Sequence, residues 1–132
     1  MDSLKPPTAV RQAAARGLEL RRKFHKGGLS TKEAGQQGIG SGVARATSLA
    51  NGNAVSPETI KRMASYFARH EVDKQGKGWG DEGAPSAGYI AWLLWGGDAG
   101  RSWANRMVKQ LESRSDAYWQ AYQAEWERLQ SR

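Results

Sequence analysis

The chain has 132 residues, a formal net charge of +7 at pH 7 and no cysteine, so disulfides, thiolate nucleophiles and cysteine-based zinc sites are excluded. Its longest apolar run, Tyr89 to Trp95, is far shorter than the roughly 20 residues of a membrane-spanning helix, and the N-terminus lacks a secretory signal, so no membrane contact is expected. The positive charge favours a polyanionic partner, either nucleic acid or an acidic protein surface.

The first predicted helix covers residues 8–26. Its apolar stripe has spacings of three and four and consists of Val10, Ala13, Gly17, Leu20 and Phe24. Gly27 and Gly28 are expected to end it, as glycines commonly end helices. Ser30 to Glu33 fits a capping box, which predicts a further short helix there, and the glycines at 35–42 predict a loop.

Two helices are predicted in the middle of the chain, over residues 42–50 and 56–69. The second has the clearest start, because Ser56 can cap it and Pro57 suits its first position. Its buried stripe is predicted to comprise Ile60, Met63, Ala64 and Phe67. Residues 73–85 are rich in glycine and charge and are predicted to form a loop, in which Trp79 anchors the chain to the core.

A buried helix is predicted over residues 86–95, since its leucine, alanine and tryptophan residues are not β-branched. Gly96 and Gly97 are expected to form a tight turn, with Asp98 capping the helix that follows. The predicted fold is all-α, a compact single domain of five or six helices. Residues 1–108 form a helical module, and residues 109–132 form an amphipathic C-terminal helical arm of the same domain.

Signatures of catalysis are weak. The run His70-Glu71-Val72-Asp73 lacks the second histidine of a zinc-protease motif, and the glycines at 35–42 lack the context of a phosphate-binding loop. We therefore predict no enzyme, no cofactor and no metal site. A hydrolase or modifying enzyme centred on His70, Glu71 and Asp98 is the weaker alternative.

Nucleic-acid binding has better support. Residues 42–50 and 56–69 have the outline of a helix-turn-helix, but Glu58 would stand where base edges are read and would repel phosphate. Sequence-independent contact with phosphates, or with an acidic protein surface, is the more plausible role of the basic residues. The candidates are Arg16, Arg21, Arg22, Lys23, Lys26, Arg45, Lys61, Arg62 and Arg69.

The C-terminal arm carries an aromatic stripe. Trp119, Tyr122, Trp126 and Leu129 recur at helical spacing, which places them on one face. This face requires a cover, and two covers are open: the core of the same chain, or a partner, which includes a second copy. Tryptophan and tyrosine are enriched where proteins bind one another, so these four residues are candidate docking residues.

Several runs follow one another in a recognisable order: they lie at 42–46, 49–52 and 56–63, continue with Phe67 to Lys74, and end with Pro85 to Gly100 and Trp103-Ala104. Together they are similar to a small helical module of tailed-phage proteins, cyanophages among them. That module occurs alone or attached to head-morphogenesis polypeptides such as prohead-protease-like chains. The resemblance covers about residues 6–108. It makes His70, Glu71, Asp73, Gly96, Gly97 and Asp98 a signature, interpreted as an Arg/His–acid network and a tight glycine turn.

The resemblance implies a phage origin and contact with the capsid, and it carries over no catalytic residue. The favoured hypothesis is a non-enzymatic structural protein of the virion, present in host cytoplasm before assembly. It would be a small basic minor-capsid or cement-like component that docks on capsid protein. The alternative is an accessory phage protein that binds DNA without sequence preference.

Overall fold

The computed structural model describes residues 4–27, 42–112 and 116–131, and the secondary structure within them is entirely helical. The elements are α1 (Thr8–Phe24), α3 (Gly42–Ala50), α4 (Pro57–His70), the 3₁₀ helix η1 (Glu71–Gln75), α5 (Ala87–Leu94), α6 (Gly97–Glu112) and α7 (Asp116–Gln130). The all-α prediction is confirmed. None of the described helices is both long and apolar enough to cross a membrane.

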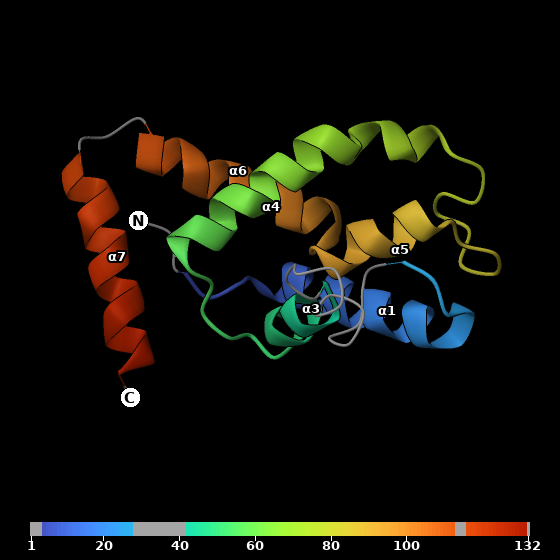
Figure 1. Ribbon diagram of the computed structural model, residues 1–132, viewed down its shortest axis with the longest axis horizontal. Coiled ribbons are helices and arrows are strands. Elements are labelled where there is room, and N and C mark those ends of the chain that lie inside the picture. The colour runs from blue at the N-terminus through green and yellow to red at the C-terminus, as the bar shows by residue number, and fades with distance from the viewer. Residues whose placement is uncertain (1–3, 28–41, 113–115, 132) are drawn as a thin grey trace, which may run out of the picture.

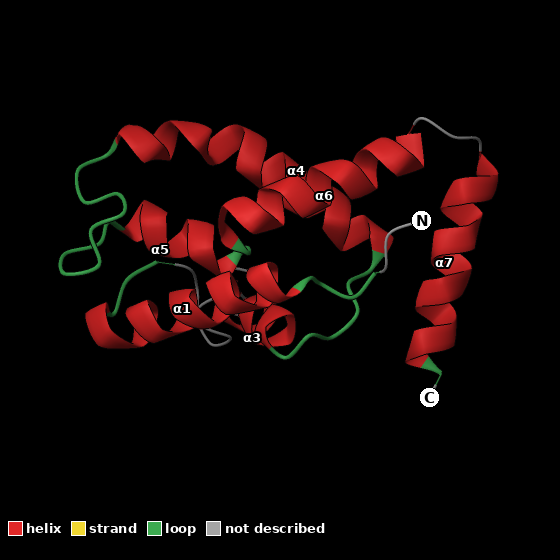
Figure 2. Cartoon of the chain, turned by 180° about the vertical axis from the view of Figure 1, so that it is seen from behind, coloured by secondary structure: helices red, strands yellow, loops and turns green. Residues whose placement is uncertain are grey.

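The helices form two layers with α5 between them (Figure 1). On one side α1 packs against α3, and on the other α4 packs against α6, which also reaches α1. Helix α7 stands across one end of the molecule and contacts α4 and α6, as Figure 2 shows from behind. The core between the layers is rich in aromatic rings, among them Phe67, Trp92 and Trp103.

Serine caps begin two of these helices, as the sequence indicated for α4. The Ser56 hydroxyl accepts a hydrogen bond from the Thr59 amide at 3.1 Å, and Ser86 does the same for Tyr89 at 3.0 Å. Each bond satisfies an amide that has no partner inside its own helix. The loop between them is anchored by Trp79, whose ring packs edge-on against Tyr89 and Trp92, so the predicted role of Trp79 is confirmed.

The buried faces of α1 and α4 differ slightly from those predicted. In α1 the fully buried alanine is Ala14, and Ala13 is only half-buried. In α4, Tyr66 joins the buried stripe, and Ala64 is half-buried. In both helices the packing neighbours decide which residues are covered, and helical spacing alone does not place the buried face to within one residue.

The end of α1 also differs from the prediction. The residue that leaves the helix in the left-handed conformation is His25, with φ of 56°, and its amide bonds the Arg21 carbonyl at 2.7 Å. Gly27, which was expected to end the helix, lies two residues further along. The short helix expected at Ser30–Glu33 and the glycine loop at 35–41 fall outside the described residues.

Glycines set the close approach between α1, α5 and α6. A Cβ on Gly17 would lie 2.8 Å from the backbone nitrogen of Leu94, so α1 crosses the end of α5 at a distance that only glycine permits. Gly96 and Gly97 have φ of 110° and 65°, a conformation that favours glycine, and they turn the chain sharply from α5 into α6. The predicted glycine turn is therefore confirmed.

The C-terminal part of the chain corrects two details. Helix α6 begins at Gly97, so Asp98 lies inside its first turn and does not cap it from outside. Helix α6 also runs to Glu112, through the expected boundary at 108/109, and the separate arm begins with α7 at Asp116. The boundary at 108/109 was placed where the resemblance to the phage module ends, whereas the helical periodicity of α6 continues past it.

Candidate docking groove

A groove of about 370 Å³ separates α3 from α4. Its lining includes Arg45 and Leu49 of α3, Val55 of the connecting turn, Arg62 of α4 and, from the far end of the chain, Trp126 of α7. Across this groove α3 and α4, both fully described, do not pack against each other, as the two helices of a helix-turn-helix would. The helix-turn-helix outline seen in the sequence is therefore not a packed pair in the structure.

Arg45 is held in place by a column of aromatic rings. Its guanidinium lies 3.9 Å from the centroid of the Trp95 ring, which stacks on Tyr66 at 4.6 Å, and Tyr66 stacks in turn on His70 at 4.5 Å. A cation on the face of a tryptophan is attracted by the ring quadrupole. The contact orients Arg45 without neutralising its charge.

Two guanidinium groups, those of Arg45 and Arg62, bring positive charge to the groove, and they lie close enough to repel each other. Burial lowers the pKa of Arg45, and the charge of Arg62 lowers it further. Arg62 is exposed and pairs with Glu58 at 3.2 Å on its own helix. Among the described residues, no carboxylate forms an ion pair with Arg45. An anion that entered the groove would meet one partly compensated and one uncompensated guanidinium.

The arm α7 folds back onto its own chain at one residue of its aromatic stripe. Tyr122 is fully buried, and its hydroxyl donates a hydrogen bond to Gln110 Oε1 of α6 at 2.6 Å. Trp126 and Leu129 remain partly exposed, and both line a second hollow of about 390 Å³ beside Lys5 and Asn53. Tyr122 is thus a core residue rather than a docking residue, and the side chain of Trp119 lies outside the described part of the chain.

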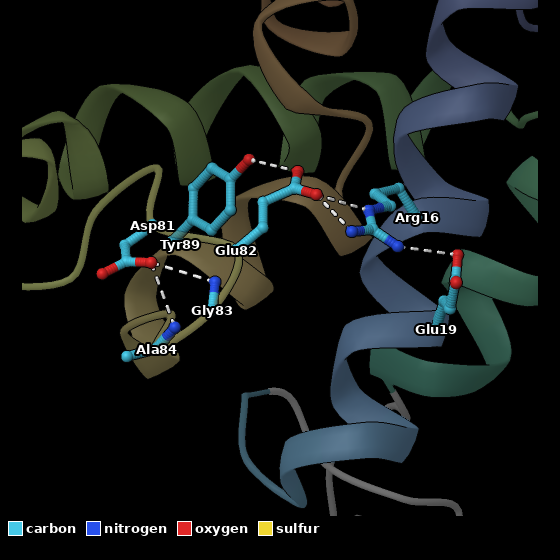
Figure 3. Close-up of polar contacts among 7 residues, drawn as sticks. All are labelled: Arg16, Glu19, Asp81, Glu82, Gly83, Ala84 and Tyr89. Carbon is cyan, nitrogen blue, oxygen red and sulfur yellow. Dashed lines mark hydrogen bonds and ion pairs between the residues drawn. The ribbon is translucent and has the colours of Figure 1, made fainter.

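Arg16 is not available to a partner in the way that its sequence position suggested. Its Nε donates to Glu82 Oε1 at 2.9 Å, Nη2 pairs with the same oxygen, and Nη1 pairs with Glu19 at 2.9 Å (Figure 3). Glu82 also accepts a hydrogen bond from the Tyr89 hydroxyl at 3.2 Å. The hydrogen bonds to these carboxylates raise the pKa of Arg16, and the bond from Arg16 lowers the pKa of Glu82. Arg16 therefore ties the 76–86 loop to α1.

The other predicted cations do not form one continuous surface. Arg22, Lys23 and Lys26 are exposed near the end of α1, where Lys23 lies 5.3 Å from the Phe24 ring, and Arg21 is half-buried. Lys61, Arg62 and Arg69 belong to α4, in the opposite layer. Of the nine predicted basic residues, the groove brings together Arg45 and Arg62.

The predicted signature forms a network of ion pairs between η1 and α6. His70 Nδ1 lies 3.0 Å from Asp73 Oδ2, and Glu71 is held between Lys74 at 3.4 Å and Arg101 at 3.1 Å. The expected pairing of His70 with an acid is present, but the arginine of the network is Arg101 of α6 and not Arg69 of the signature run. The sequence analysis did not identify Lys74 and Arg101 as partners of Glu71. Lys74 adjoins the acids in the sequence and could have been found, whereas no periodic pattern relates Arg101 to η1.

Asp98 extends this network to the core. Its Oδ1 accepts a hydrogen bond from the indole Nε1 of Trp92 at 2.9 Å and pairs with Lys74 at 3.1 Å. The Lys74 ammonium also lies 4.8 Å from the Trp92 ring centroid. Glu71 and Asp98, two of the three residues in the weak hydrolase hypothesis, are thus engaged by cations. No group of three or more metal-ligating side chains occurs within the residues that the structure describes.

Comparison with known proteins adds no relative: no family model, curated protein or solved structure matches this chain.

Proposed function

We propose that this chain is a non-enzymatic structural protein of a tailed-phage virion, a small basic component that docks on capsid protein. The observation that carries the proposal is that α7 buries one residue of its aromatic stripe and leaves two others partly exposed. Tyr122 fixes the arm to α6, while Trp126 stays partly exposed at two neighbouring hollows and Leu129 at one of them. Partly exposed aromatic side chains beside concave surfaces are typical of binding edges.

The signature network supports a structural role over a catalytic one. Glu71 and Asp98 neutralise Lys74 and Arg101, and Asp98 also bonds the buried Trp92 indole. Groups engaged in this way hold η1 against α6. The resemblance of residues 6–108 to a phage module supplies the assignment to a virion, and the charge of +7 suits an acidic shell surface.

Trp126→Ala tests the proposal. The tagged chain is expressed during infection, particles are purified, and the protein is quantified per particle against the major capsid protein. The wild-type chain is expected to be present in fixed stoichiometry. Trp126→Ala is expected to lower incorporation about tenfold or more, in the range of a binding hot spot. Leu129→Ala is expected to lower it by a smaller factor.

Val72→Ala is the matched control, because Val72 is an exposed apolar residue of η1, far from α7 in sequence. It is expected to be incorporated like the wild type. Circular dichroism on each variant establishes that the fold is retained. Purified particles without the protein would refute the proposal, and so would equal incorporation of wild type and a folded Trp126→Ala variant.

The alternative, DNA binding without sequence preference, is favoured by one observation. Arg22, Lys23 and Lys26 are exposed near one end of α1, where His25 is exposed as well. Such a cluster can neutralise phosphates without reading bases.

A further inference from the structure

We propose that the groove between α3 and α4 binds an acidic, amphipathic segment of a partner protein. An apolar side chain of that segment would enter the groove, and a neighbouring carboxylate would bind Arg45 and Arg62. The inference rests on the proposed docking function and names the chemistry of the partner at one site.

The walls of the groove include apolar side chains that could hold an apolar side chain of the partner. Leu49 and Val55 are buried core residues whose edges reach the groove, and Trp126 closes it from α7. Small residues, Ala44 and Ala54, leave the space between these larger side chains. A hollow of about 370 Å³ is large enough for one or two apolar side chains, and helices of a partner commonly place side chains of this kind in such grooves.

The two guanidinium groups of the groove support an anionic ligand, because the carboxylates beside them do not balance their positive charge. Arg45 is oriented by Trp95 at 3.9 Å and has no ion pair with any described carboxylate. Arg62 shares the groove, and its pair with Glu58 is exposed to solvent on both sides, which makes it weak. A carboxylate between them would relieve their repulsion and could accept paired N–H bonds from a planar guanidinium.

A protein segment suits these features better than a nucleic acid. Single-stranded nucleic acid is bound by a basic channel that follows many phosphates, with several aromatic faces for successive bases. This groove offers two cations and one tryptophan, and its remaining walls combine aliphatic side chains with the hydroxyl residues Ser48, Ser56 and Thr59. The match is to one anionic group beside one apolar group, which is the pattern of an acidic amphipathic helix.

Direct binding to a designed probe tests the inference. The probe is a fluorescein-labelled 15-residue helical peptide with leucine on one face and glutamate beside it, titrated with the full-length chain at low salt. Saturable binding with Kd of roughly 100 µM or tighter is expected, an affinity within reach of one apolar anchor and one charge-assisted bond. The same peptide with glutamine in place of glutamate is expected to bind at least tenfold more weakly.

Two pairs of variants localise the binding. Arg62→Gln removes a groove cation and is expected to weaken binding about tenfold, while Arg69→Gln removes the same charge from the exposed surface of α4 and is expected to change it less than twofold. Ala44→Glu places a carboxylate at the groove and is expected to abolish binding, while Ala68→Glu on α4 is its matched control. All four positions are exposed, so the fold should tolerate each change.

The outcomes separate this inference from the proposed function. No saturable peptide binding, or equal weakening by Arg62→Gln and Arg69→Gln, would overturn the groove inference even where Trp126→Ala reduces incorporation into particles. Tighter binding of oligo-dT than of the peptide, with the same sensitivity to Ala44→Glu, would overturn it in favour of nucleic acid. Peptide binding with the expected variant pattern, but no protein in particles, would refute the virion role and leave the groove inference standing.

Discussion

At Gly17 a missing side chain sets the distance between two helices. The sequence places Gly17 on the apolar stripe of α1, where its small size permits a close neighbour. Only the structure shows which neighbour: the backbone at Leu93 and Leu94 of α5, within 3.0 Å of where a Cβ would stand. Because backbone atoms cannot rotate away as a side-chain tip can, the contact tolerates no added carbon.

Gly17→Ala is expected to destabilise the protein by about 1–3 kcal/mol through overpacking, although alanine is the better helix former by about 1 kcal/mol. Denaturant unfolding measures the change. Ala15→Gly is the control at an exposed position of the same helix and is expected to cost only the propensity, about 1 kcal/mol. A stabilised Gly17→Ala variant would show that α1 and α5 are further apart than described.

For Tyr122 and Trp126, helical spacing does not decide which side chain is buried. Both lie on one aromatic stripe, and helical periodicity treats them alike. In the structure one is fully buried against α6 and the other lines two hollows. The angle at which α7 meets α4 and α6 decides which of them is covered, and that angle is not encoded in the spacing.

Among the elements, the loop between η1 and α5 is tied to α1 by a side-chain clamp, in addition to its anchor at Trp79. Arg16 on α1 bonds Glu82, 66 residues away, and Tyr89 bonds the same carboxylate. Within the loop, Asp81 accepts hydrogen bonds from the amides of Gly83 and Ala84 at 2.9 and 3.1 Å, which shapes the turn that presents Glu82 (Figure 3). The loop was predictable from its glycines, but the clamp was not, since nothing in a sequence pairs residues so far apart.

Stability is expected to depend on pH through this clamp. The hydrogen bond from Arg16 lowers the pKa of Glu82 in the folded state. A lowered folded pKa means that the carboxylate stabilises the fold above its unfolded pKa and that this contribution is lost as pH falls through the folded pKa. The wild type should therefore have a higher Tm than Glu82→Gln at pH 7, and the difference should vanish in strong acid.

Thermal unfolding followed by circular dichroism from pH 7 down to about pH 2 measures this difference. Glu127→Gln is the control: it removes an exposed acid from α7 and leaves the clamp intact, so its Tm should follow that of the wild type. Curves for wild type and Glu82→Gln that stay parallel over the whole range would show that the clamp does not hold in solution.

Across the whole molecule, the division of the basic residues between two layers bears on the DNA-binding alternative. The exposed cations near the end of α1 and those of α4, which are Lys61, Arg62 and Arg69, belong to opposite layers, whereas Arg45 of α3 lies in the layer of α1. We expect a straight duplex that lies on the α1 cluster not to reach the cations of α4. The sequence alone does not separate these basic residues, so from the sequence all of them could contact one duplex.

Any binding to random-sequence duplex DNA is therefore expected to be weakly salt-dependent. The slope of log K against log salt should be about −3 or shallower, since each phosphate contact contributes about −0.9 and six contacts would give about −5. Fluorescence anisotropy at several salt concentrations measures it. Replacing Arg22 and Lys23 by glutamine should flatten the slope more than Arg62→Gln does. A wild-type slope of −5 or steeper would contradict the division into two clusters.

The sequence by itself determined the all-α class, the serine cap at Ser56, the glycine turn at Gly96 and Gly97, and the anchoring role of Trp79. These are local properties, since a cap or a turn is decided by residues within one helical turn of one another. The tertiary structure alone decided that Arg16 is a clamp, that Arg45 lies on Trp95 beside Arg62, and that Trp126 closes their groove. These contacts join residues far apart in the chain, and they form only once burial of apolar surface has fixed how the helices cross.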